Sequence, residues 1–168
     1  MKKILKLILC ASIFLSFGCN DKENTAVEFT LTNDLSSQIF HGFSFRKMDT
    51  ITFPNSENII PDLMVVYLIN DFGDISGPFL SHQNAENRFA LIGTFENRIS
   101  AQDCFDTISC SNNSAYQSFT PEIKPYEIWQ VKTTTEEVGV ILILEARVEK
   151  IGSGGIAEMK FKAKKFLL

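Results

Sequence analysis

The strongest constraint on the fold is a two-residue alternation of apolar and polar side chains in the last third of the chain. In residues 156–166 the inward set is Ala157, Met159, Phe161 and Ala163, and the outward set is Glu158, Lys160, Lys162 and Lys164. In residues 137–149 the apolar set that we expect on one face is Val138, Val140, Leu142, Leu144, Ala146 and Val148. Side chains alternate between the two faces of a β-strand, so both segments are predicted strands. We interpret the lysine row as the solvated face of an edge strand.

The same reasoning extends β structure over the rest of the chain. The further predicted strands are residues 26–32, 39–45, 62–69, 88–95 and 127–133. Residues 62–69 are almost all apolar, so we expect that strand to be covered on both faces. Turn residues separate the segments, including 70–74 and the run Lys150–Gly155. The fold class predicted is mainly β: one antiparallel sheet or sandwich-like domain with one short helix, over residues 26–168.

The N-terminus has the pattern of a secretory signal peptide. Lys2 and Lys3 precede a short apolar run, which ends at Gly18 and Cys19. This run is shorter than the ~20 residues that a transmembrane helix needs. The segment before Cys19 resembles the lipobox of bacterial lipoproteins, which implies cleavage after residue 18 and acylation of Cys19. The polar residues 19–25 then form a tether, similar to surface-export signals of Bacteroidetes lipoproteins.

These features predict where the mature chain resides. The expected location is the outer membrane, lipid-anchored and displayed at the cell surface, with a periplasm-facing anchor as the alternative. Loss of the signal peptide with its three lysines leaves thirteen basic against twenty acidic residues. An acidic chain without a basic patch is a poor partner for nucleic acid or anionic lipid. Attachment to the membrane therefore depends on the lipid of Cys19.

Two cysteines remain in the predicted mature domain apart from Cys19. Cys104 and Cys110 would lie in an oxidising compartment, so we expect them to form a disulfide. A metal site or a reduced pair are the alternatives. Their spacing requires that a helix through them end before Cys110, because disulfide Cα atoms lie ~5–6 Å apart. Ser100 followed by Asp103 indicates a helix start, which predicts a helix near residues 101–108.

The sequence contains no recognisable catalytic set. There is no G-x-S-x-G motif and no cysteine–histidine arrangement, and Asp71 and Asp74 lie in a predicted turn without the spacing of a calcium loop. The glycine-rich run 152–155 joins two strands and precedes no helix, so it lacks a phosphate-binding geometry. We therefore expect a protein that is not an enzyme, with an uncharacterised hydrolase as the second alternative.

The two histidines are the main candidate cofactor residues. His41 is predicted to share a face with Phe43 and Phe45, where a hydrogen-bonded core histidine is the simplest reading. The alternative is an axial haem ligand, with His82 or a methionine opposite. The methionines considered for that role are Met48, Met64 and Met159.

Four short segments resemble the strand pattern of HmuY-type lipoproteins of Bacteroidetes. They are GFSF at 42–45, IWQVKT at 128–133, VGVILIL at 138–144 and IAEMKFK at 156–162. The resemblance implies an all-β fold, and haem capture at the cell surface in some members, but it aligns neither histidine with a ligand position. The triplets at 49–51 and 106–108 likewise resemble the O-glycosylation acceptor of Bacteroidetes.

The function predicted from these features is that of a membrane-anchored lipoprotein of the cell envelope without enzymatic activity. It would act as a β-rich binding or accessory module for an envelope protein or a small ligand. No cofactor is expected in this reading. The alternative function is a surface haem-binding lipoprotein of the HmuY type.

Overall fold

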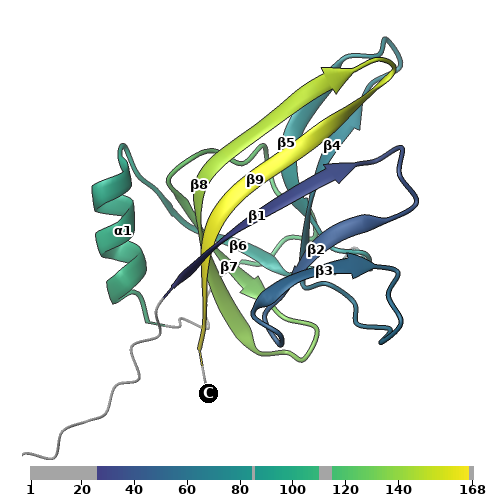
Figure 1. Ribbon diagram of the computed structural model, residues 1–168. Coiled ribbons are helices and arrows are strands. Elements are labelled where there is room, and N and C mark those ends of the chain that lie inside the picture. The colour runs from purple at the N-terminus through teal and green to yellow at the C-terminus, as the bar shows by residue number, and fades with distance from the viewer. Residues whose placement is uncertain (1–25, 85, 110–114, 167–168) are drawn as a thin grey trace, which may run out of the picture.

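The computed structural model describes residues 26–84, 86–109 and 115–166, which form two antiparallel sheets and one helix (Figure 1). The first sheet has the order β1 (Val27–Asp34), β9 (Gly154–Lys165), β8 (Val138–Ile151), β7 (Glu127–Lys132) and β6 (Phe89–Thr94). The second has the order β3 (Asp49–Phe53), β2 (Phe40–Ser44), β4 (Leu63–Ile69) and β5 (Ile75–Ser81). The prediction of a mainly β, sandwich-like domain with one short helix is confirmed.

The main core lies between the two sheets. Phe43 of β2 is fully buried, and its ring meets those of Phe45 and Phe161 edge-on at centroid distances of 5.0 and 5.2 Å. Trp129 of β7 and Tyr67 of β4 are the largest buried side chains of this core. Burial of each large apolar side chain contributes ~1.5–3 kcal/mol to folding, so this layer supplies most of the cohesion between the sheets.

A β-bulge divides β8 into two halves, and the alternating apolar side chains of the two halves point to opposite faces of the sheet. Val140 and Leu142 face the helix, whereas Ala146 and Val148 pack against the core between the sheets. The pairing of β8 with β9 shifts between Ile143 and Glu145. One extra residue in a strand moves all later side chains to the other face. The prediction that all six apolar positions of this strand share one face is therefore wrong beyond Leu144.

The helix α1 (Arg98–Thr107) covers the outer face of β7 and β8. It buries Ala101 and Phe105 against a second, smaller apolar cluster. The expected end before Cys110 is confirmed, but the helix starts earlier than residue 101, because the side chain of Asn97 rather than Ser100 caps it. Asn97 Oδ1 accepts a hydrogen bond from the Ser100 backbone N–H at 3.0 Å, as N-cap side chains do.

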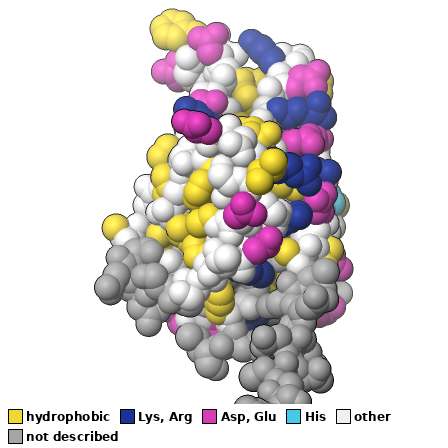
Figure 2. All heavy atoms as spheres, turned by 90° about the vertical axis from the view of Figure 1, so that its left-hand side faces the viewer, with side chains coloured by type: hydrophobic (Ala, Val, Ile, Leu, Met, Phe, Trp, Pro, Cys, Tyr) yellow, Lys and Arg dark blue, Asp and Glu magenta, His cyan; other side chains and the backbone are white. Residues whose placement is uncertain are grey.

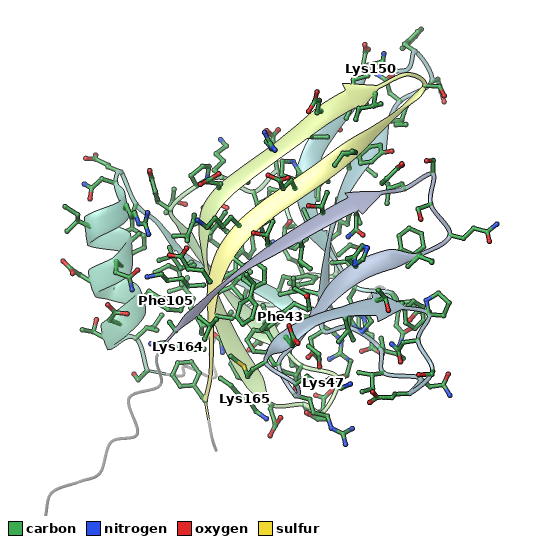
Figure 3. All side chains as sticks on the ribbon, in the orientation of Figure 1. Phe43, Lys47, Phe105, Lys150, Lys164 and Lys165 are labelled. Carbon is green, nitrogen blue, oxygen red and sulfur yellow. The ribbon has the colours of Figure 1, made fainter. Side chains whose placement is uncertain are left out.

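The lysine side chains of β9 contact the helix α1 and the neighbouring strand β1. Strand β9 lies between β1 and β8, so its interpretation as an edge strand is wrong, although the alternation itself is confirmed. Lys162 Nζ donates to Gln102 Oε1 at 2.8 Å. Lys164 Nζ donates to the Phe105 carbonyl and lies 4.9 Å from the centre of the Phe105 ring, as Figure 3 shows beside the helix. These amines dock α1 onto the sheet.

Strands β3 and β5 complete the second sheet and were not predicted. The five residues of β3 are mostly polar, and β5 contains Gly77 and Pro78, which are turn signals; proline is nevertheless compatible with an edge strand such as β5. Strand β4 is covered on one face only. Leu68 near its end is 50% exposed, so the expectation that residues 62–69 are covered on both faces is wrong.

Candidate functional site

A cleft with a volume of about 630 Å³ lies at one end of the sandwich. It is lined by residues 34–36, residues 67–69, Ile151 and residues 153–155. These segments come from the end of β1, the end of β4 and the hairpin between β8 and β9, which meet at the upper end of Figure 1. We call this hollow the distal cleft.

The distal cleft lies at the opposite end of β1 from the point where the chain enters the domain. In the antiparallel pairing of β1 with β9, Val27 is opposite Ala163 and Asp34 is opposite Ile156. Strand β1 therefore runs from the lower end of the sheet to the edge of the cleft, next to the hairpin that opens β9 (Figure 1). A tether before residue 26 would join the molecule at the end away from the cleft.

The floor of the cleft is fixed by Tyr67 and Gly155. The Gly155 backbone N–H donates to the Tyr67 hydroxyl at 2.9 Å, and Tyr67 is almost fully buried. A Cβ on Gly155 would lie 2.7 Å from Ile75 Cδ1 and 2.8 Å from the Glu149 carbonyl oxygen. Only glycine allows this close approach of β9, so the cleft has a rigid base.

An exposed phenylalanine stands on the turn between β4 and β5. Phe72 is 91% exposed. Asn70 orders this turn: its Oδ1 accepts hydrogen bonds from the backbone N–H groups of Phe72 and Asp74, at 2.9 and 2.8 Å. The composition of residues 70–74 predicted the turn but not the high exposure of Phe72 on it. The only sequence signal was a large aromatic residue among turn-forming asparagine, aspartate and glycine.

The charged groups around the cleft are mostly acidic. Asp34 accepts hydrogen bonds from the Ser36 hydroxyl at 2.7 Å and the Ser36 backbone N–H at 2.8 Å. The bond from the Ser36 hydroxyl, and then the bond from the Ser36 backbone N–H, hold the pKa of the Asp34 carboxyl below its ordinary value. Asp34 is therefore ionised at neutral pH. Lys150 Nζ donates to the Gly73 carbonyl at 2.6 Å and thereby joins the two hairpin tips (Figure 3).

The two histidines lie in different environments. His41 is exposed and lines a shallow hollow of about 220 Å³ with Thr30, Thr32 and Thr50, so the expectation that it is a core histidine beside Phe43 and Phe45 is wrong. His82 is 3% exposed; its Nδ1 accepts from the Asn84 backbone N–H at 3.2 Å.

Charged groups surround the buried side chain of His82. Burial, and secondarily the nearby Arg88 guanidinium, lowers the pKa of His82, while Glu86 and Asp62 act in the opposite direction. Its Nε2 has no hydrogen-bond partner among the described residues. Of the methionines considered as haem ligands, Met159 is fully buried in the core, Met48 packs against the core, and Met64 is half-buried on β4.

Several predicted sites lie partly or wholly outside the described residues. Cys19 and the signal peptide are among residues 1–25, and Cys110 falls within 110–114. Cys104 is half-buried on α1, so the disulfide stays a prediction. The threonines of the two triplets, Thr50 on β3 and Thr107 at the end of α1, are both exposed.

Two further observations concern metals and membranes. In the described part of the chain, no group of three or more histidine, cysteine, aspartate or glutamate side chains is arranged to hold a metal ion. Within residues 26–84, 86–109 and 115–166, no helix combines the length and hydropathy needed to cross a bilayer.

The fold and the cleft together define a β-sandwich domain with a hollow at the end remote from its N-terminal strand entry. Comparison of the chain with protein-family models, with curated proteins and with solved structures found no match.

Proposed function

We propose that this protein is a lipid-anchored binding module of the cell envelope, without enzymatic activity, which presents the distal cleft away from the membrane. The observation that carries the proposal is the position of the cleft at the far end of β1 from the chain entry. A lipid on Cys19 would hold the lower end of the domain near the bilayer. The apolar cleft would then face outward, where a partner can reach it.

The composition of the cleft supports binding rather than catalysis. Its described lining contains one carboxylate, Asp34, and one phenol, Tyr67, whose oxygen already accepts a hydrogen bond from Gly155. The remaining walls are apolar side chains, serines and glycine backbone. Ligand-binding sites are mostly apolar hollows with a few placed polar groups, which is the character of this cleft.

The anchor is tested by metabolic labelling with a palmitate analogue in the native host. We expect the label on the wild type and none on Cys19→Ala, with the wild-type chain in the membrane fraction. A chain that retains its leader and takes no label would contradict the anchor.

The orientation is tested by cysteine labelling on whole cells with a bulky, membrane-impermeant maleimide. Ser153 lies at the β8–β9 turn and Val27 at the start of β1, and both side chains are exposed. We expect Ser153→Cys to react faster than Val27→Cys, because the membrane would hinder access to the tethered end. The wild type measures the background from native cysteines. Equal rates, or protection of Ser153→Cys alone, would contradict an outward-facing cleft.

A further inference from the structure

Phe72 is the most exposed large apolar side chain of the described residues, and it stands on an ordered turn. The turn is closed by backbone hydrogen bonds from Asn70 N–H to the Asp74 carbonyl at 3.0 Å and from Gly73 N–H to the Asn70 carbonyl at 2.9 Å. The Asn70 side chain adds three more hydrogen bonds. A solvent-exposed aromatic ring on an ordered turn resembles the anchors that dominate protein interfaces.

The apolar surface around Phe72 is larger than a single ring. Leu68, Ile69 and Ile151 are also exposed, and all three line the distal cleft. We call these four side chains, together with the cleft, the distal surface. Exposed apolar groups that gather in one place mark interaction sites, whereas scattered ones are ordinary. The Lys150–Gly73 hydrogen bond fixes the two hairpin tips relative to each other, which reduces the entropy lost on binding.

The distal surface is also acidic. The carboxylates on or next to its segments are Asp34, Asp71, Asp74 and Glu149, and the basic groups are the Lys150 amine and the Arg147 guanidinium near Glu149. Figure 2 shows hydrophobic and acidic side chains at the upper end of the molecule, with Lys and Arg side chains among them. Complementary charge steers a partner and selects against wrong ones. The surface therefore fits a partner that combines apolar side chains with positive charge.

We propose that the distal surface binds a polypeptide segment in which apolar side chains are flanked by lysine or arginine, with Phe72 as the principal anchor. This inference rests on the proposed function as a binding module and names its class of partner. The apolar groups extend from the cleft to the tip of the β4–β5 turn, which suits an extended chain better than a small ligand. The carboxylates disfavour an anionic bilayer, and in a second copy they would face like charges.

The experiment measures binding of fluorescent synthetic peptides by anisotropy. The protein is the chain from Cys19 onward with Cys19→Ser, which keeps every described element but carries no lipid. The probe is a short peptide with paired leucines between lysines. Its controls replace the lysines by glutamates or the leucines by serines. Phosphatidylcholine vesicles and sedimentation of the protein alone test a lipid surface and self-association.

The matched variants are Phe72→Ser and Ile99→Ser. Ile99 is 75% exposed but lies on α1, which packs on the other half of β8, away from the distal surface. We expect Phe72→Ser to weaken binding of the leucine–lysine peptide by about tenfold or more, and Ile99→Ser to leave it unchanged. Asp71→Asn should weaken it by about twofold, with Asp103→Asn on α1 as its control. Unfolding curves should be unchanged, because these side chains are exposed.

The inference is overturned if the peptide binds Phe72→Ser as well as the wild type, if the control peptides bind equally well, or if no peptide binds. It is also overturned if Phe72 is needed instead for vesicle binding or for dimer formation. Each of these outcomes leaves the anchoring and orientation experiments unaffected. Conversely, loss of palmitate labelling would remove the proposed function without changing the affinity of the purified chain for the peptide.

Discussion

Asn33 and His41 exchange two hydrogen bonds across the corner between the two sheets. Asn33 Oδ1 accepts from the His41 backbone N–H at 2.6 Å, and Asn33 Nδ2 donates to the His41 carbonyl at 2.7 Å. The same Nδ2 donates to the Val65 carbonyl at 3.0 Å. Strands β2 and β4 pair only through Gly42 and Phe43, so the buried amide of Asn33 supplies the bonds that the diverging strands no longer make to each other.

We expect Asn33→Ala to lower the free energy of unfolding by about 2–3 kcal/mol, because it leaves backbone groups of both strands without partners in a buried place. Thr32→Ala, at the exposed neighbouring position, should cost less than about 0.5 kcal/mol. Urea unfolding of both variants measures the difference. Equal stabilities would show that water replaces the Asn33 amide.

Lys164 should stabilise the end of α1. Its amine donates to the Phe105 carbonyl and lies 3.3 Å from that of Ile108, so it places a positive charge where the helix dipole is negative. Burial lowers the pKa of the Lys164 amine, which Asp106 partly offsets. We expect Lys164→Met to lower the free energy of unfolding by about 1 kcal/mol and to speed amide exchange in the last turn of α1.

The control for Lys164→Met is Lys160→Met on the same face of β9. Lys160 pairs with Glu28, with both side chains partly exposed, and such pairs contribute ~0–1 kcal/mol. Lys160→Met should leave exchange in α1 unchanged. If both variants speed amide exchange in α1 equally, the loss of helix stability comes from removal of a positive charge on β9 and not from the contact of Lys164 with the helix end.

His82 should make the fold sensitive to acid. Its pKa is lowered from the ordinary value of 6.5, so the unfolded chain binds a proton more readily than the folded chain. The stability that neutral His82 contributes is complete above pH 6.5 and is lost as the pH falls through the interval down to the lowered pKa. Unfolding free energies measured from about pH 8 to about pH 5 should fall less steeply for His82→Gln than for the wild type.

Gly139 should not tolerate a side chain. A Cβ there would lie 2.1 Å from Phe45 Cε1, in the middle of the packed core. Overpacking of this kind costs ~1–3 kcal/mol, so we expect Gly139→Ala to lower the thermal midpoint clearly. Gly154→Ala is the control, since its nearest neighbour would be the Tyr67 hydroxyl at 3.5 Å. A Gly139→Ala protein as stable as the control would mean that the Phe45 ring moves aside at little cost.

Haem remains the alternative ligand because of the resemblance to HmuY-type lipoproteins. We expect haemin, titrated in both oxidation states, to give no shifted Soret band, since His41 is exposed beside threonines in a shallow hollow and His82 is buried. A shifted band that disappears in His41→Ala or His82→Ala would contradict this expectation and favour the haem-binding function.

The sequence predicted the strands whose apolar residues alternate strictly, and it failed where a single residue changed the pattern. The pattern of 156–166 survives in β9 because every second side chain meets the core. In β8 the bulge near Leu144 cannot be read from a run of apolar residues, since each of them suits either face. Strand β5 was not predicted because Gly77 and Pro78 are residues typical of turns. An edge strand nevertheless accepts them.

The distal cleft was less predictable than the strands. Its walls come from residues near positions 35, 68 and 153, which are brought together only by the order of the strands in the two sheets. Short-range periodicity contains no information about that order. His41 illustrates the same limit: alternation predicts which face of the strand it occupies, but it does not predict that His41 lies beyond the core and is exposed.

The antiparallel pairing of β1 with β9 has a mechanical consequence. Under the proposed anchoring, a bound partner that pulls on the distal surface loads the molecule between its two ends, in the direction in which β1 runs. The eight paired positions, from Val27 to Asp34, then share the force in shear and must yield together. A perpendicular load would instead peel them apart one at a time. The first strand after the tether is thus oriented to withstand tension along the line from the membrane to the partner.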